Sequence, residues 1–217
     1  MNKVVSYAIF QNRNTSRKLV YYPVAKNANS SAKLFFLKHL KIDKSYYFLS
    51  DKIPDYKINK DPKYKKLDKK YNLINFLPSY TPFEKIDVDE KCCIVRDPIN
   101  RFISAYKNRI LFHKDFGFQN LSIDEIIEKM ENKSFDNKHF LPQSYWLGSD
   151  LKYFTIVANI SNMETFINGV NDFFQNSVEF PRIQTGGNDK NISLTDGQKN
   201  KLKKIYSSDY DLIGDLL

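Results

Sequence analysis

The fold is decided by a stretch near the middle of the chain, where residues 92–106 read CCIVRDPINRFISAY. The apolar run at residues 92–95 is typical of a strand that is buried on both faces. Pro98 suits the first turn of a helix, because the N–H that proline lacks would have no partner there. The stretch therefore predicts a buried strand followed at once by a helix, with Arg96 at the junction.

This junction has the features of an anion site. The carboxyl end of a buried strand and the amino end of a helix both favour a bound anion, since backbone N–H groups point outward there. Arg96 can reach such an anion from the strand, and Ser104 brings a hydroxyl from about two turns into the helix. A structural ion pair of Arg96 at a capped junction explains the local pattern equally well.

An earlier segment repeats the arrangement of strand, loop and helix. Residues 18–24 (KLVYYPV) are rich in strand formers, and residues 32–40 (AKLFFLKHL) predict a helix. The small and polar residues between them would let a phosphate or sulfate approach the backbone, with Lys26 adding a charge. This loop contains Ala25, Lys26, Asn27, Ala28, Asn29, Ser30 and Ser31. The alternative is an ordinary turn in which Ser30 or Ser31 caps the helix.

Strands that alternate with helices predict an α/β fold with a central parallel sheet flanked by helices. Further strands are expected at residues 45–49 and 151–157. The lysine-rich segment between residues 50 and 89 predicts a long loop or insertion. Helices are also predicted from three capping-box patterns, which begin at Ser122, Ser161 and Thr195. Both anion-suited loops would then lie at the carboxyl edge of one sheet.

Composition narrows the classes of protein that the chain can represent. Its 217 residues are 41% hydrophobic and include 14 tyrosines and 17 phenylalanines, enough for the core of one domain over residues 1–217. The net charge of +9 favours an anionic partner such as a nucleotide, a nucleic acid, an acidic polysaccharide or a membrane surface.

The cysteines and the amino terminus bear on the compartment. Cys92 and Cys93 would point to opposite faces of their strand, so no disulfide is expected and a reducing compartment is favoured. Residues 1–19 contain no apolar stretch typical of a signal peptide or membrane span. A cytoplasmic location is therefore expected, and the basic surface would allow peripheral contact with a membrane.

The two motifs resemble those of the type-2 carbohydrate sulfotransferase family, whose donor is 3′-phosphoadenosine 5′-phosphosulfate (PAPS). Residues 26–31 (KNANSS) are similar to the family's 5′-phosphosulfate loop. Residues 96–106 resemble its 3′-phosphate motif, Arg-Asp-Pro-x-x-Arg-x-x-Ser-x-Tyr. His-x-x-Pro-Gln at residues 139–143, Glu164 and Tyr-x-x-Asp-Tyr at residues 206–210 extend the resemblance over most of the chain. The resemblance implies the P-loop-like fold of a PAPS-dependent sulfotransferase, in a soluble bacterial member.

The resemblance also implies an activity, the transfer of a sulfuryl group from PAPS to a hydroxyl of a carbohydrate acceptor. It implies that Arg96 and Ser104 hold the 3′-phosphate, and that residues 26–31 hold the 5′-phosphosulfate with Lys26 nearest the bridging oxygen. A later loop that closes over the nucleotide would contain Arg182, Thr185 and Gly186. The acceptor would suit the basic surface if it is anionic, and neither a metal ion nor a nucleic acid is expected as a partner.

Sulfuryl transfer requires positive charge at the leaving oxygen and a general base for the acceptor hydroxyl. Lys26 is the candidate for the charge, and Lys33 is the alternative because some branches carry the basic residue later in the loop. His139 is the first candidate for the base, from its His-x-x-Pro-Gln context. Glu84 and His39 are the alternatives to His139.

Two other functions fit parts of the sequence. A nucleotide kinase of the P-loop type would need a Gly-Lys-Ser/Thr ending and a magnesium-binding carboxylate after a strand, and the sequence shows neither. A basic nucleic-acid-binding protein is compatible with the lysines and tyrosines, but a recognised binding motif is lacking. The sulfotransferase is therefore the preferred hypothesis.

Overall fold

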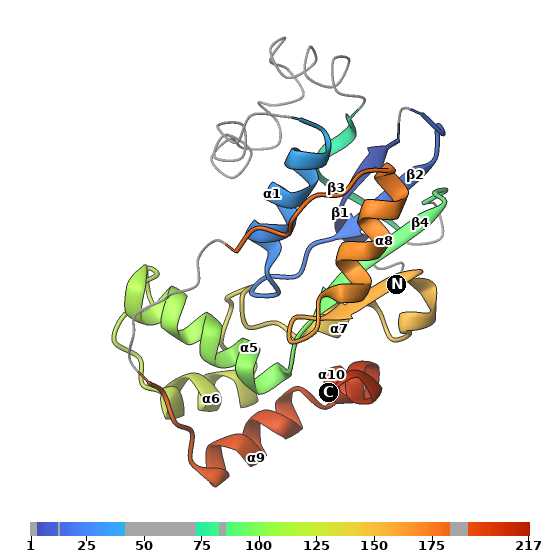
Figure 1. The fold of residues 1–217 in the computed structure, drawn as a ribbon. Helices are drawn as coiled ribbons and strands as arrows, with labels where there is room; N and C mark the ends of the chain where they lie inside the picture. The colour runs from blue at the N-terminus through green and yellow to red at the C-terminus, as the bar shows by residue number, and fades with distance from the viewer. Residues whose placement is uncertain (1–3, 13, 42–72, 83–85, 183–190) are drawn as a thin grey trace.

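The computed structural model describes residues 4–12, 14–41, 73–82, 86–182 and 191–217 (Figure 1). Within them a five-stranded sheet has the strand order β3-β1-β2-β4-β5. The strands are β1 (Val4–Gln11), β2 (Lys18–Tyr22), β3 (Leu73–Pro82), β4 (Glu90–Val95) and β5 (Ile156–Asn159).

The sheet combines a parallel part with an antiparallel edge. β2, β4 and β5 run parallel, and Cys92 of β4 lies in register with Tyr21 of β2 and Ile156 of β5. β1 pairs antiparallel with both β2 and β3. The predicted α/β class with a central parallel sheet is confirmed for β2, β4 and β5, whereas the hairpin of β1 and β2 was not predicted.

Helices cover both faces of the sheet and form a further layer at one end (Figure 1). They are α1 (Asn29–His39), α5 (Pro98–Ala105), α6 (Ile123–Glu131), α7 (Gln143–Leu147), α8 (Glu164–Phe174), α9 (Asp196–Ile205) and α10 (Ser207–Ile213). A π-helix (Tyr106–Phe112) continues α5. α1 and α8 pack on one face of the sheet, and α7 and α10 pack on the other.

β4 is buried on both faces of the sheet. Cys92 and Ile94 are buried against α1 and α8, in a cluster that includes Phe166. Cys93 and Val95 are buried on the opposite face, with α7 and α10. The continuous apolar run therefore forms a strand buried on both sides, as the sequence predicts, and the two cysteines point apart.

The helices beyond the sheet share a core of their own. Phe102 of α5 packs with Ile110 of the π-helix, Ile127 of α6, Leu202 of α9 and Tyr206. This cluster fixes α5 in place, and α5 follows β4 after only two residues. The direction in which the β4–α5 junction points is therefore set by packing from both the sheet and the helical layer.

α1 begins earlier than the sequence predicts. Its first residue is Asn29 rather than Ala32, and the cap position is taken by Ala28 in the left-handed conformation (φ 53°, ψ 22°). Ser30 and Ser31 are therefore residues of the first turn and not the cap that the sequence suggested. Among the described residues, no side chain caps this helix.

The predicted strand at residues 151–157 is also corrected. Leu151–Tyr153 form a 3₁₀ turn, and β5 begins only at Ile156. The side chain of Asp150 accepts a hydrogen bond from the N–H of Lys152 (2.8 Å), which favours the turn over an extended start.

The predicted capping boxes divide into two that form and one that does not. The boxes are confirmed at Ser122 and Thr195. At α8 the cap position is Met163, and the Asn162 side chain accepts from the N–H of Glu164 (3.2 Å). The box expected from Ser161 is therefore wrong, because an Asn turn takes its place.

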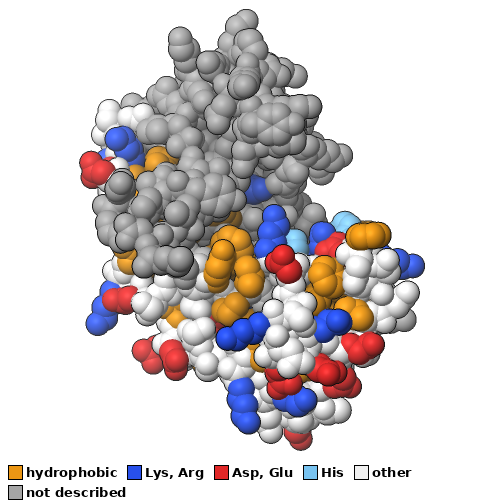
Figure 2. Space-filling view, turned by 180° about the vertical axis from the view of Figure 1, so that it is seen from behind, with side chains coloured by type: hydrophobic (Ala, Val, Ile, Leu, Met, Phe, Trp, Pro, Cys, Tyr) orange, Lys and Arg blue, Asp and Glu red, His pale blue; other side chains and the backbone are white. Residues whose placement is uncertain are grey.

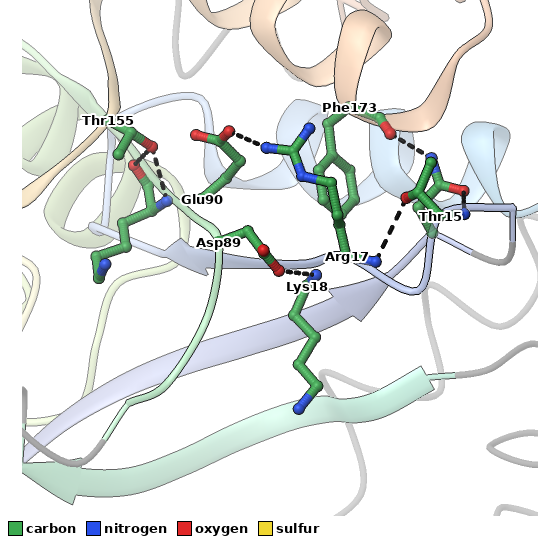
Figure 3. A network of polar contacts seen from close by, with 9 residues as sticks. Thr15, Arg17, Lys18, Asp89, Glu90, Thr155 and Phe173 are labelled. Atoms are coloured by element: carbon green, nitrogen blue, oxygen red, sulfur yellow. Dashed lines mark hydrogen bonds and ion pairs between the residues drawn. The ribbon is translucent and has the colours of Figure 1, made fainter.

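The amino ends of β2 and β4 are joined by polar contacts (Figure 3). The backbone N–H of Lys18 donates to Asp89 Oδ2 (2.7 Å), and the N–H of Asp89 donates to the Lys18 carbonyl oxygen (3.0 Å). Arg17 forms an ion pair with Glu90 and also lies over the ring of Phe173, 5.9 Å from its centroid. One ion pair and two hydrogen bonds from backbone N–H groups thus fix the start of β2 against the start of β4.

Two predictions fall partly outside the described residues. The strand expected at residues 45–49 lies outside them. Within the segment between residues 50 and 89, residues 73–82 form β3 at the sheet edge. Over the described parts of the chain, no helix combines the length and apolar character needed to cross a bilayer.

Candidate active site

The loops that follow β2 and β4 meet at the carboxyl edge of the sheet (Figure 1). The two strands are parallel neighbours, so their ends lie side by side. Nη1 of Arg96 donates to the carbonyl oxygen of Lys26 at 3.1 Å, which joins the loops directly. The two anion-suited motifs, 70 residues apart in the chain, therefore form one site.

The loop after β2 turns sharply before α1 starts. Lys26 (φ 72°) and Ala28 (φ 53°) both adopt the left-handed conformation, which is uncommon for residues with a Cβ atom. Asn27 between them is buried, and its Nδ2 donates to the carbonyl oxygen of Ile94 in β4 at 2.8 Å. Contacts with β4 hold this strained loop, and the loop leads directly into a helix start, where anions are favoured.

Four basic side chains converge on this loop, namely Lys26, Arg96, Arg101 and Arg109. Burial, and then the charges of the three arginines, lower the pKa of Lys26 from 10.5 to about 8. Among the described carboxylates, none pairs with the Lys26 ammonium group. Arg109 is paired with Asp115, but the Lys26 ammonium group lies among like charges without a carboxylate of its own, so the arrangement indicates a site for an anion. Figure 2 shows several Lys, Arg and His side chains close together on the face turned away in Figure 1.

Arg101 is fully buried behind the site and connects two of its segments. Its Nε donates to the carbonyl oxygen of Ala25 (3.0 Å), and its Nη2 donates to the carbonyl oxygen of His139 (3.2 Å). Arg101 therefore joins the loop that carries Lys26 to the segment that carries His139. In the sequence, Arg101 stands out only as one position of the motif at residues 96–106.

Several buried polar atoms around these loops have no hydrogen-bond partner in the described part of the protein. They are Arg96 Nε, Arg101 Nη1, His139 Nδ1, Asn27 Oδ1 and Asn29 Oδ1. Buried polar atoms are normally hydrogen bonded, and isolated exceptions are few. Their concentration at one place indicates that a polar ligand completes the site, with guanidinium donors for its anionic groups.

His139 adds a neutral imidazole to the site. Burial, followed by the charges of Arg109 and Lys26, lowers its pKa to about 4. The backbone N–H of His139 donates to Asn137 Oδ1 (3.1 Å), which fixes the segment. At neutral pH the imidazole is therefore uncharged and has a free lone pair, although the lowered pKa makes it a weaker base than an ordinary histidine.

Arg109 is a residue of the site that sequence reasoning missed. It lies on the π-helix and forms a bidentate ion pair with Asp115 (2.7 and 2.6 Å). Asn137 Nδ2 also donates to Asp115 Oδ2 (3.1 Å). A π-helical turn contains an extra residue, so α-helical spacing from Arg101 does not place Arg109 on the side facing Lys26.

Comparison with known proteins agrees with the geometry. A family model described as the sulfotransferase family matches residues 11–214. The chain belongs to the sulfotransferase family. It is therefore a transferase whose reaction is a sulfuryl transfer, as the resemblance implied. No curated protein and no solved structure gives a significant match.

The other predicted donor-binding residues of this sulfotransferase differ in exposure, and two of them lie outside the described residues. Ser104 is half-buried on α5, and in the described structure it makes no hydrogen bond to Arg96. Arg182 is exposed at the end of a described segment. Thr185 and Gly186 lie outside the described residues.

The alternatives to Lys26 and His139 lie elsewhere. Lys33 is in the second turn of α1. His39 is at the opposite end of α1 from Lys26, its ring stacked on Phe174 (4.7 Å between centroids) and hydrogen bonded to Asn176. His39 is therefore a core histidine and cannot reach an acceptor at the Lys26 loop. Glu84 lies outside the described residues.

Proposed function

We propose that this member of the sulfotransferase family transfers the sulfuryl group of PAPS to a hydroxyl group of a carbohydrate. The observation that carries the proposal is the convergence of Lys26 with three arginines where β2 leads into α1. A nucleotide with two separated anionic groups would match two loops that each favour an anion and that lie at one sheet edge.

The residues around these loops have the donors that such a nucleotide needs. Residues 26–31 would hold the 5′-phosphosulfate, because they form the turn and the first residues of α1. Arg96 and Ser104 would hold the 3′-phosphate. Arg96 is only half-buried, and its Nε, which has no partner among the described residues, is a donor suited to phosphate or sulfate oxygens.

When bound, PAPS would supply the sulfuryl group and a 3′-phosphoadenosine 5′-phosphate leaving group. Lys26 would neutralise the charge that develops on the leaving oxygen, and its lowered pKa makes its proton easier to donate. His139 would accept the proton of the acceptor hydroxyl, since its imidazole is neutral. The remaining task of the site is alignment, which demands fixed loops more than covalent chemistry.

The carbohydrate acceptor is proposed on two grounds. The motifs at residues 26–31 and 96–106 resemble those of the type-2 carbohydrate sulfotransferases. The net charge of +9 would attract a glycan that is itself anionic.

Calorimetry tests the donor. We expect adenosine 3′,5′-bisphosphate, which is the product nucleotide, to bind in the micromolar range without magnesium. Tighter binding of ATP with magnesium would instead indicate a nucleotide kinase. Binding of random oligonucleotides that the bisphosphate does not displace would indicate a nucleic-acid-binding protein.

A turnover assay tests the acceptor. Radiolabelled PAPS incubated with a panel of neutral and anionic glycans should label at least one of them. The Lys26→Ala variant is the matched control, because it should bind the same glycans without labelling them. Labelling of phenols or proteins in place of glycans would overturn the carbohydrate proposal while leaving the donor proposal intact.

A further inference from the structure

Gln143 occupies a central place behind the site, although it is fully buried at the first position of α7. Its Oε1 accepts hydrogen bonds from Asn27 Nδ2 (2.6 Å) and from the backbone N–H of Arg96 (3.0 Å). Its Nε2 donates to the carbonyl oxygen of Arg96 (2.7 Å). One carboxamide thus bonds to the loop after β2 on one side and to the loop after β4 on the other.

Asp209 holds Gln143 from behind. The Asp209 carboxylate accepts from the backbone N–H groups of Gln143 (2.8 Å) and Ser144 (2.8 Å), and Gln143 Nε2 lies 3.4 Å from its Oδ2. These contacts satisfy the first N–H groups of α7, which would otherwise lack partners. Tyr206, one turn before Asp209, donates its hydroxyl to the Phe140 carbonyl oxygen (2.8 Å) and fastens the same segment.

The chemistry of the carboxamide explains why a glutamine suits this position. A primary amide can accept and donate two hydrogen bonds each, and Gln143 uses this capacity on Asn27, on both backbone groups of Arg96 and on Asp209. A glutamate would set a second carboxylate against Asp209, and an apolar residue would leave the buried groups of Arg96 without partners.

We propose that Gln143 is a positioning residue that sets the separation between the two halves of the donor site. This inference rests on the proposed function, because the two halves are the loop of Lys26 and the loop of Arg96. Gln143 has no exposed surface, so it acts through Asn27 and Arg96 and not by contact with the donor. A fully satisfied buried network has one geometry, and that geometry would match a ligand with two anionic groups.

This role has a measurable signature. A ligand that contacts both loops binds more tightly when their separation is already fixed. If the loops were free to move, binding would also have to order one loop against the other, which costs free energy. A ligand that binds one loop has little to gain. Loss of Gln143 should therefore weaken a nucleotide with phosphates at both ends far more than a nucleotide with one phosphate.

The test compares three ligands on the full chain and its Gln143→Met variant, which keeps the side-chain volume but loses the amide. Calorimetry would measure adenosine 3′,5′-bisphosphate, adenosine 5′-monophosphate and adenosine 3′-monophosphate. We expect the bisphosphate to bind the variant at least about tenfold more weakly, and each monophosphate to change by less than about threefold. Gln119→Met, the same change at an exposed position, should leave all three affinities unchanged.

The possible outcomes separate the two proposals. If the wild-type chain binds the bisphosphate and Gln143→Met loses affinity equally for all three ligands, the positioning role is wrong and the proposed function stands. If the wild-type chain does not bind the bisphosphate, both fail. Circular dichroism would establish that Gln143→Met is folded. If it is not, Gln143→Asn gives the same comparison, since it keeps an amide that is one methylene too short to reach both loops.

Discussion

The guanidinium group of Arg96 donates a hydrogen bond to the carbonyl oxygen of Lys26 at 3.1 Å. The two residues that the family resemblance would place at opposite ends of the donor are therefore in direct contact, through the guanidinium group of one and the main chain of the other. Arg96 uses Nη1 for this contact, while its buried Nε has no partner among the described atoms. A single arginine can thus shape the Lys26 loop and still offer a donor to a ligand.

Arg96→Ala should weaken binding of adenosine 3′,5′-bisphosphate by about 2–3 kcal/mol, the usual value of a charge-assisted contact. Calorimetry measures this directly. Arg17→Ala is a suitable control, because Arg17 is paired with Glu90 at the amino end of β2 (Figure 3) and should not affect the affinity. Normal binding by Arg96→Ala would show that the 3′-phosphate lies elsewhere.

Lys26→Ala should nearly abolish turnover while the circular dichroism spectrum stays that of the wild type. The pH dependence should carry the signature of the same lysine. With a pKa of about 8, Lys26 is protonated below this pH and loses its proton above it. Because the charged form is needed, kcat/KM should fall as the pH rises through about 8. Lys26→Arg should move this fall to higher pH, and an unchanged profile would count against the assignment.

His139→Ala should lower kcat by about 10²–10⁴-fold, the usual contribution of a general base. The wild-type rate should not decline between pH 7 and pH 5, since the pKa of His139 is lowered to about 4 by burial and by its basic neighbours. The exposed His113 supplies a control, as His113→Ala should retain the full rate. A full rate in His139→Ala would transfer the base role to another residue.

The core histidine His39 should make the fold sensitive to acid. Burial lowers its pKa from 6.5 to about 4 in the folded protein, so between these values the unfolded chain binds more protons than the folded one. His39 therefore costs no stability above pH 6.5, the pKa of the histidine in the unfolded chain, and the free energy of unfolding declines as the pH falls from about 6.5 towards 4. His39→Phe should lose less stability than the wild type between neutral pH and pH 5 in urea titrations, and equal losses would contradict this account.

Two glycines in helices should respond to alanine in opposite ways. A Cβ atom on Gly169 of α8 would lie 2.9 Å from Cδ1 of Ile156 in β5, so Gly169→Ala should destabilise the protein by about 1–3 kcal/mol. Gly197 of α9 has space, with Thr195 Oγ1 at 3.9 Å, so Gly197→Ala should stabilise by about 0.5–1 kcal/mol. Thermal unfolding would measure both, and the same sign for both would be unexpected.

Sequence predicts those parts of the fold that depend on interactions between residues close together in the chain. The apolar run that forms β4 and the boxes at Ser122 and Thr195 need no information from elsewhere in the chain. The meeting of Lys26 and Arg96 was also predictable, because parallel neighbouring strands end at one edge. The β1 strand was missed although a polar turn at Asn12, whose Oδ1 accepts from the N–H of Asn14 (2.8 Å), separates it from β2.

The rest of the site depends on contacts that no local pattern contains. The hydrogen bond from Gln143 to Asp209 joins residues 66 positions apart, so the sequence shows the two residues but not their connection. Arg109 reaches the site through a π-helical turn, which changes the helical spacing on which a sequence interpretation relies. The start of α1 depends on the left-handed residues Lys26 and Ala28 and on Asn27 between them, which bonds to β4, whereas the residue types alone left a serine cap as an alternative.

Because Cys92 and Cys93 point to opposite faces of β4, their reactivity can report separately on the unfolding of each face. They are the two cysteines of the chain, each is fully buried, and burial raises the pKa of both thiols. An alkylating reagent can reach either sulfur only when β4 separates from the helices on the corresponding face. The two labelling rates, resolved by mass spectrometry, would therefore report which of the two helical layers detaches first.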